Sequence, residues 1–99
     1  MNSEDFDKEL DNIRHNYEIP FYKTIASVLG RGGISVQYKE YQNLSLSEKE
    51  RLINSRDALV NAHQVLLSKW RHTLKEDYIE YYLSYIAFLE ARIKTEDKK

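Results

Sequence analysis

Apolar residues recur at helical spacing along most of the chain, and the longest such stretch, residues 45–94, contains neither glycine nor proline. Within it, Ile53, Val60 and Leu67 repeat every seven residues, a spacing that places side chains on one stripe of a helix. From Tyr78 onward, apolar residues cover well over half of the helix circumference. The pattern predicts an all-α fold: a small helical bundle of four or five helices with a long C-terminal helix or helical hairpin.

Capping signals predict where the long helical segment begins and where it breaks. Ser45 and Glu48 have the spacing of a capping box, in which a hydroxyl and a carboxylate satisfy free backbone N–H groups at a helix start. We therefore expect the long helix to begin between these two residues. Thr73 and Glu76 repeat the spacing, which predicts a break near residues 72–77 and a tyrosine-rich segment that folds back as a hairpin.

Residues 1–44 predict short helices. The apolar face of a first helix consists of residues at helical spacing, namely Phe6, Leu10, Ile13 and Tyr17. Pro20 is expected to end that helix and to stand in the first turn of a second one, which Gly30 would cap in the left-handed conformation. Residues 34–43 fit either a strand or a helix. We favour a short helix because a strand would have no obvious partner.

Length and composition limit which classes of protein the chain can belong to. Ninety-nine residues make one helical domain (1–99), with short helices and a loop over 1–44, the long segment over 45–95 and a frayed tail at 96–99. The 16 acidic and 15 basic residues leave a net charge of −1, which removes any whole-protein attraction to nucleic acid. Without cysteine there is no disulfide or thiolate chemistry. No apolar run is long enough to span a membrane, so we expect an intracellular, cytoplasmic protein with no membrane partner.

Candidate catalytic and metal-binding chemistry is sparse. His63 and His72 lie nine residues apart, on opposite faces of the expected helix. His63 falls within the apolar stripe, where it is either a buried, hydrogen-bonded histidine or a pH switch. Acidic pairs such as Asp7 and Asp11 lie near a helix start, where the helix dipole accounts for them. We therefore expect no enzyme, no cofactor and no metal site.

A small residue, a glycine and an apolar residue follow one another at fixed spacing in residues 24–41: Ala26, Gly30 and Val36. This segment resembles a helix-turn-helix of the lambda-repressor-like kind. The resemblance implies a DNA-binding regulator that contacts bases and phosphates through Arg31, Gly33, Ser35, Gln37 and Lys39. A helix, a glycine cap and a new helix without any role in DNA binding fit the same residues.

Tyrosine is over-represented, with eight in 99 residues and four of them between positions 78 and 85. Its ring favours burial while its hydroxyl seeks a polar partner, so interfaces are enriched in it. The short N-terminal helices look too small to cover both halves of the long segment, which would leave an apolar surface for another chain. The candidate interface residues are Arg56, Trp70, Tyr78, Tyr81, Tyr82, Tyr85, Phe88 and Arg92.

The preferred hypothesis is a non-enzymatic protein-binding or regulatory module that presents a Tyr/Leu-rich helical surface to another protein, or to a second copy as a homodimer. The alternative is a helix-turn-helix transcriptional regulator that uses residues 24–41. We do not favour nucleic acid as the partner because no basic face supports it.

Overall fold

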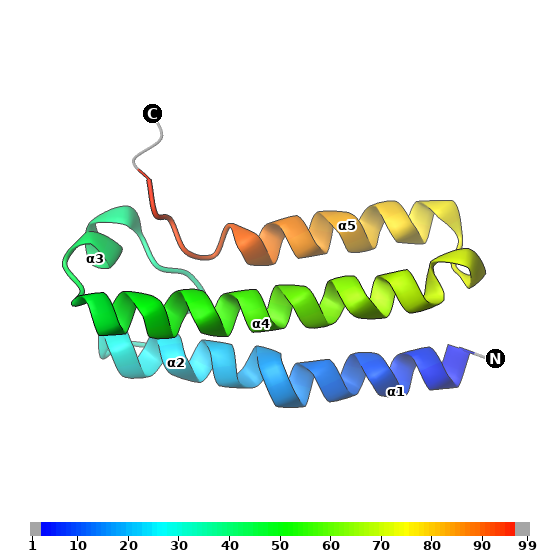
Figure 1. Ribbon diagram of the computed structural model, residues 1–99, viewed down its shortest axis with the longest axis horizontal. Coiled ribbons are helices and arrows are strands. Elements are labelled where there is room, and N and C mark those ends of the chain that lie inside the picture. The colour runs from blue at the N-terminus through cyan, green and yellow to red at the C-terminus, as the bar shows by residue number, and fades with distance from the viewer. Residues whose placement is uncertain (1–2, 97–99) are drawn as a thin grey trace.

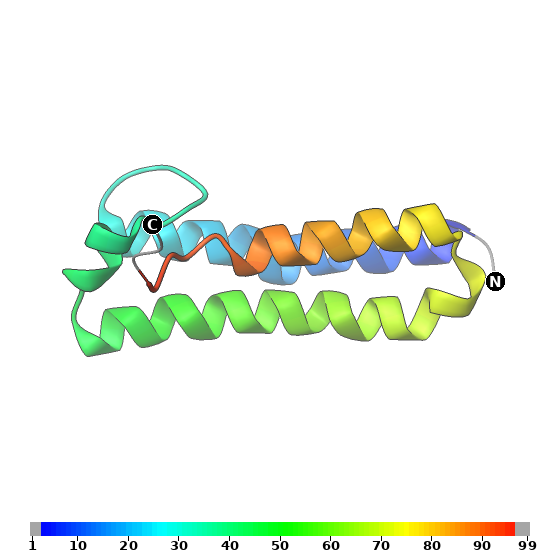
Figure 2. The same ribbon diagram turned by 90° about the horizontal axis from the view of Figure 1, so that it is seen from above.

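Three helical rods lie side by side in the computed structural model, which describes residues 3–96 (Figures 1 and 2). The first rod comprises α1 (Ser3–Ile13), η1 (Arg14–Glu18) and α2 (Ile19–Leu29), the second is α4 (Leu46–Trp70), and the third is α5 (Glu76–Glu90). In chain order the short α3 (Tyr38–Gln42) comes between the first two rods, and the turn η2 (Arg71–Thr73) joins α4 to α5. The predicted all-α bundle with a C-terminal hairpin is confirmed.

Pro20 stands in the first turn of α2, as predicted, but the helical path of the first rod does not end there. Its helical path continues through a π turn, η1, in which the N–H of Ile19 bonds to the carbonyl of Arg14 five residues earlier. The wider turn comes directly before a proline, which has no N–H to continue the α-helical pattern. It also shifts the helix phase. In an unbroken α-helix Phe21 would lie about 60° from Phe6 and Ile25 about 100° away, yet all three are buried on the same core.

Because the first rod is continuous, it runs along most of the length of α4 (Figure 1). The N-terminal helices therefore cover α4, the first half of the long segment, as one rod rather than as separate short helices, while α5 keeps exposed aromatic and apolar side chains. Both α1 and α2 pack against α4, as does α5. The central helix contributes the largest share of the core, with these residues buried: Leu52, Leu59, Val60, His63, Leu66, Leu67 and Trp70.

The predicted start and break of the long helix are both confirmed, the second by different contacts. Ser45 caps α4, and Glu48 closes the capping box. Between α4 and α5, the Thr73 hydroxyl donates to the Trp70 carbonyl at 2.8 Å rather than capping α5, whose N-cap is Lys75. The break also turns the half-buried Leu74 towards the core.

Residues 34–37 find a partner that the sequence did not reveal. Val36 forms an isolated parallel bridge with Ile93, in which its N–H donates to the Arg92 carbonyl at 2.7 Å and its carbonyl accepts from the Lys94 N–H at 3.0 Å. Both bridge side chains are buried. The favoured short helix is confined to α3. The tail expected at 96–99 lies, from residue 97 onward, outside the described residues.

Candidate functional site

A groove of about 380 Å³ separates the first rod from α5 and has α4 at its base. It lies where α1, η1 and α5 each pack against α4. One wall comes from α1 and η1, the other from α5, and a single residue from α4. The lining residues are Asp7, Leu10, Asp11, Arg14, Glu18, His63, Tyr78, Tyr81, Tyr82 and Tyr85. The space therefore has a mixed aromatic and carboxylate lining.

At the base of the groove, His63 and Tyr82 form a buried polar pair. Their exposed fractions are 3% and 2%, and His63 Nδ1 lies 2.6 Å from the Tyr82 hydroxyl oxygen. The other ring nitrogen, Nε2, is buried and has no hydrogen-bond partner among residues 3–96. Burial lowers the pKa of His63, and the negative charge of Glu18 only partly opposes this. The imidazole is therefore neutral at pH 7.

The π turn places Glu18 opposite α5. The hydroxyl of Tyr85 donates to the Glu18 carboxylate, and the Arg14 guanidinium lies 4.0 Å from the same carboxylate. Burial, followed by this contact with Glu18, raises the pKa of Tyr85 above its ordinary value of 10.0. The bond joins the two walls at one end of the groove, so η1 positions a residue that an unbroken α-helix would rotate elsewhere.

Aromatic rings on α5 continue from the groove onto the surface. The rings of Tyr85 and Phe88 stack with centroids 6.0 Å apart, and the Arg92 guanidinium covers Phe88 at 3.6 Å. Tyr81 is 66% exposed, which is high for so large a ring. Tyr78 is half-buried against it, with centroids 6.1 Å apart. These rings form a continuous stripe, Tyr81, Tyr85 and Phe88, along one side of α5.

The predicted interface residues separate into three places. Tyr78, Tyr81, Tyr82 and Tyr85 line the groove, and Phe88 with Arg92 extends the stripe. Trp70 lies in the core, where its indole N–H donates to Glu9 at 2.7 Å, so it presents no surface to a partner. Arg56 lies away from the groove, donating to the Glu90 carbonyl at 3.2 Å and to Asp57 at 3.0 Å.

The opposite wall was missed in the sequence. Asp7 and Asp11 follow the first turn of α1, where their charge has a sufficient explanation in the helix dipole. Arg14 and Glu18 lie in the π turn, and no sequence motif predicts that turn. The i, i+4 and i+7 spacing of Asp7, Asp11 and Arg14 is the one signal that a shared polar face exists.

The helix-turn-helix geometry is not present in residues 24–41. Gly30 caps α2 with φ 69°, as predicted, but the next helix begins only at Tyr38 and has 5 residues. Gly33, Ser35 and Gln37 therefore lie before it, in a non-helical segment rather than on a recognition helix. Within the described part of the chain, the DNA-binding alternative loses the geometry on which it rested.

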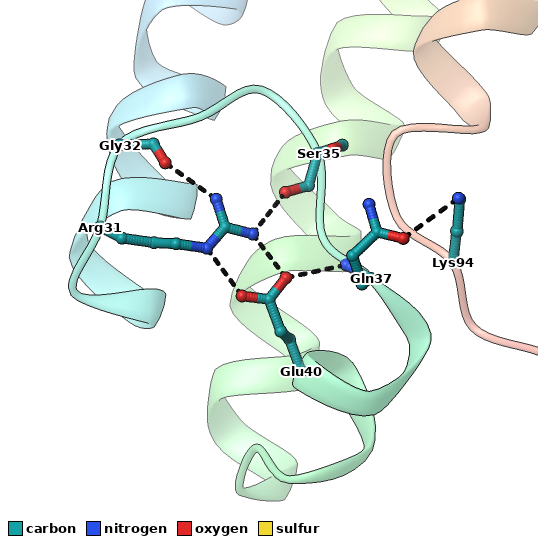
Figure 3. Close-up of polar contacts among 6 residues, drawn as sticks. All are labelled: Arg31, Gly32, Ser35, Gln37, Glu40 and Lys94. Atoms are coloured by element: carbon teal, nitrogen blue, oxygen red, sulfur yellow. Dashed lines mark hydrogen bonds and ion pairs between the residues drawn. The ribbon is translucent and has the colours of Figure 1, made fainter.

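Within the described residues, the Arg31 side chain forms all of its hydrogen bonds with residues 32–40, close to it in the chain. It donates to Glu40 through Nε at 2.7 Å and Nη2 at 2.5 Å, and to the carbonyls of Gly32 and Ser35 (Figure 3). Glu40 also accepts the N–H of Gln37, and the Arg31 guanidinium is the main cause that lowers the pKa of this carboxyl to about 2. Arg31 thus stabilises the loop. Lys39 is exposed on α3.

Two further classes of site find no support among residues 3–96. No cluster of three or more histidine, aspartate or glutamate side chains is arranged to hold a metal ion. None of the helices there combines the length and apolar character needed to cross a bilayer. Comparisons of the chain with protein-family models, with curated proteins and with solved structures found no match.

Acid is expected to destabilise the protein through His63. Its pKa in the folded state lies below the ordinary 6.5, so between these two values the unfolded chain binds the proton more readily. The contribution of neutral His63 is complete above about pH 6.5 and is lost as pH falls towards the lowered pKa. Urea unfolding at pH 7.5 and 5.5 should show a loss of stability in the native protein that is smaller in His63→Gln.

The control for this comparison is His15→Gln, which removes an exposed histidine. Its stability should fall between the two pH values as much as that of the native protein. The pH window stays above the titration of Glu9, Glu40 and Glu48, whose pKa values are all lowered. An equal loss in His63→Gln and the native protein would contradict the prediction.

Proposed function

We propose that this chain is a non-enzymatic protein-binding or regulatory module that holds side chains of a partner helix in the groove between α1, η1 and α5. The observation that carries the proposal is the aromatic stripe beside that groove, with Tyr81 two-thirds exposed. Exposed aromatic rings next to a recess that admits side chains are the usual anchoring points of a protein interface. Tyrosine adds hydroxyl groups that can pair with polar groups of a partner.

A helix is the partner structure that the groove favours. The first rod and α5 both run antiparallel to α4 (Figures 1 and 2). Residues of these two rods line the opposite walls of the groove. A further helix laid between them would complete a four-helix arrangement, in which each helix packs against two neighbours. Its apolar side chains would enter the groove at i, i+3, i+4 and i+7 spacing, the mode by which amphipathic helices bind apolar grooves.

Charge favours a different protein over a second copy of this chain. Asp7, Asp11 and Glu18 line the groove against one guanidinium, that of Arg14. In a two-fold symmetric dimer the same surface meets itself. Two such grooves would bring carboxylates together, and like charges across an interface weaken it. We therefore place heterotypic binding ahead of the homodimer.

Burial of the groove's histidine favours binding over catalysis. A general base must reach the proton it removes, directly or through one water. His63 Nδ1 is engaged by Tyr82, and Nε2 is buried. The Glu18 carboxylate accepts from Tyr85. The groups best suited to acid–base catalysis, His63 and Glu18, are therefore already hydrogen-bonded to tyrosine side chains of α5.

The test is binding of three designed helical peptides of about 18 residues, a length at which isolated helices become stable. All share one apolar stripe, and their flanks carry lysine, glutamine or glutamate. We expect at least one to shift the backbone amide resonances of groove residues, and Tyr81→Ala to weaken it by about tenfold. Leu83→Ala, which removes an exposed side chain of α5 outside the groove, is the matched control. The proposal fails if no peptide perturbs the groove.

A further inference from the structure

We infer that the partner helix is cationic and that it places a lysine or arginine side chain between the carboxylates of α1 and the tyrosine rings of α5. This inference rests on the proposed function and adds the chemistry of the partner. It starts from the charge balance of the groove, in which three carboxylates face one guanidinium.

The carboxylates of Asp7 and Asp11 have no strong internal counter-charge. In the described part of the chain, no lysine or arginine forms an ion pair with Asp7, and the nearest basic group to the Asp11 carboxylate is His15 Nδ1 at 3.6 Å. Arg14 is directed to Glu18 at 4.0 Å and has an exposed side chain. Glu18 also accepts from Tyr85. A cation supplied from outside would therefore meet Asp7 and Asp11 first.

The tyrosines opposite these carboxylates provide faces that attract the same charge. A lysine or arginine over a tyrosine ring gains about 0.5–1 kcal/mol at an exposed site. Tyr78 lies close enough to Asp7 for its pKa to be raised by that charge, after the larger effect of burial. One cation can consequently interact with both the ring and the carboxylate. The chain itself contains this type of contact, with Arg92 over Phe88 at 3.6 Å and Lys49 over Tyr41 at 5.3 Å.

The three peptides described above test the inference by their order of affinity. The lysine-flanked peptide should bind about tenfold more tightly than the glutamine-flanked one, and the glutamate-flanked peptide should be weakest. This preference should shrink as salt is raised from low to physiological concentration, since ions screen exposed charges. If glutamine and lysine peptides bind the groove equally well, the charge inference is overturned while the proposed function stands.

A double variant, Asp7→Asn with Asp11→Asn, identifies the groups responsible. We expect it to reduce the lysine preference to less than about threefold while the glutamine-flanked peptide keeps its affinity. The control is Glu50→Gln with Glu80→Gln, which removes the same charge from exposed positions outside the groove and should leave the preference unchanged. Circular dichroism verifies that both variants fold. Equal losses in the two variants, or a dimer that occupies the groove by sedimentation and cross-saturation NMR, would overturn the inference.

Discussion

Replacing Phe6 with alanine is expected to lower the free energy of unfolding by about 3–5 kcal/mol, as for other buried aromatic residues. Phe6 is 5% exposed and joins all three rods near the end where α4 turns into α5. Its ring meets the rings of Trp70, Tyr78 and Tyr82 edge-on, with centroids 5.7, 5.9 and 6.3 Å away. Its removal would leave a cavity beneath the groove, because Tyr78 and Tyr82 line the groove above it.

Urea unfolding followed by circular dichroism measures this loss, and thermal unfolding should show a midpoint lowered by more than about 12 °C. The control Phe6→Leu keeps most of the buried apolar surface and should cost about a third as much. A loss below about 1 kcal/mol in Phe6→Ala would show that α1 does not dock on α4 and α5 in solution. The groove would then lack one wall, and the proposed function would lose its basis.

Much of the fold was predictable because local signals and the tertiary structure agree. The seven-residue spacing of Ile53, Val60 and Leu67 predicted α4, and the capping box of Ser45 predicted its first turn. These signals depend on residues within one or two turns of each other. They are therefore readable without knowledge of what the helix packs against.

The features that were wrong or missed depend on contacts between distant segments. Pro20 signals a helix end locally, yet the π turn lets the rod continue and returns Phe21 to the core. Val36 pairs with Ile93, 57 residues later, so no local pattern could indicate a partner. Tertiary packing can override a local signal that would end a helix, when continuing the helix buries enough apolar surface in the core.

The candidate site also has one part that the sequence predicted and one part that it did not. The tyrosines of one wall were predicted as an interface because their number is a property of composition. Whether each is buried or exposed was not readable, and Tyr82 lies at the base while Tyr81 lies on the rim. Asp7 and Asp11 could not be assigned to the groove from the sequence, because they line it only through the packing of α1 opposite α5.

Replacing Tyr82 with phenylalanine is expected to cost about 1–3 kcal/mol of stability, although only one hydroxyl is lost. The change removes the partner of His63 Nδ1, and Nε2 has none within the described part of the chain, so both nitrogens of a buried ring would lack a side-chain partner there. The matched control is Tyr81→Phe, which removes a hydroxyl from an exposed ring. It should change stability by less than about 0.5 kcal/mol. Urea unfolding at pH 8, where His63 is neutral in both states, is the measurement.

A double-mutant cycle with His63→Leu separates the bond from the packing. If the bond exists in solution, the double variant should be more stable than the two single losses predict, by about 0.5–3 kcal/mol. Additive losses would contradict it. Replacing both members of a buried polar pair with apolar groups is often nearly neutral. A double variant as stable as the native protein, yet weaker in peptide binding, would mean that the pair at the base of the groove serves recognition rather than folding.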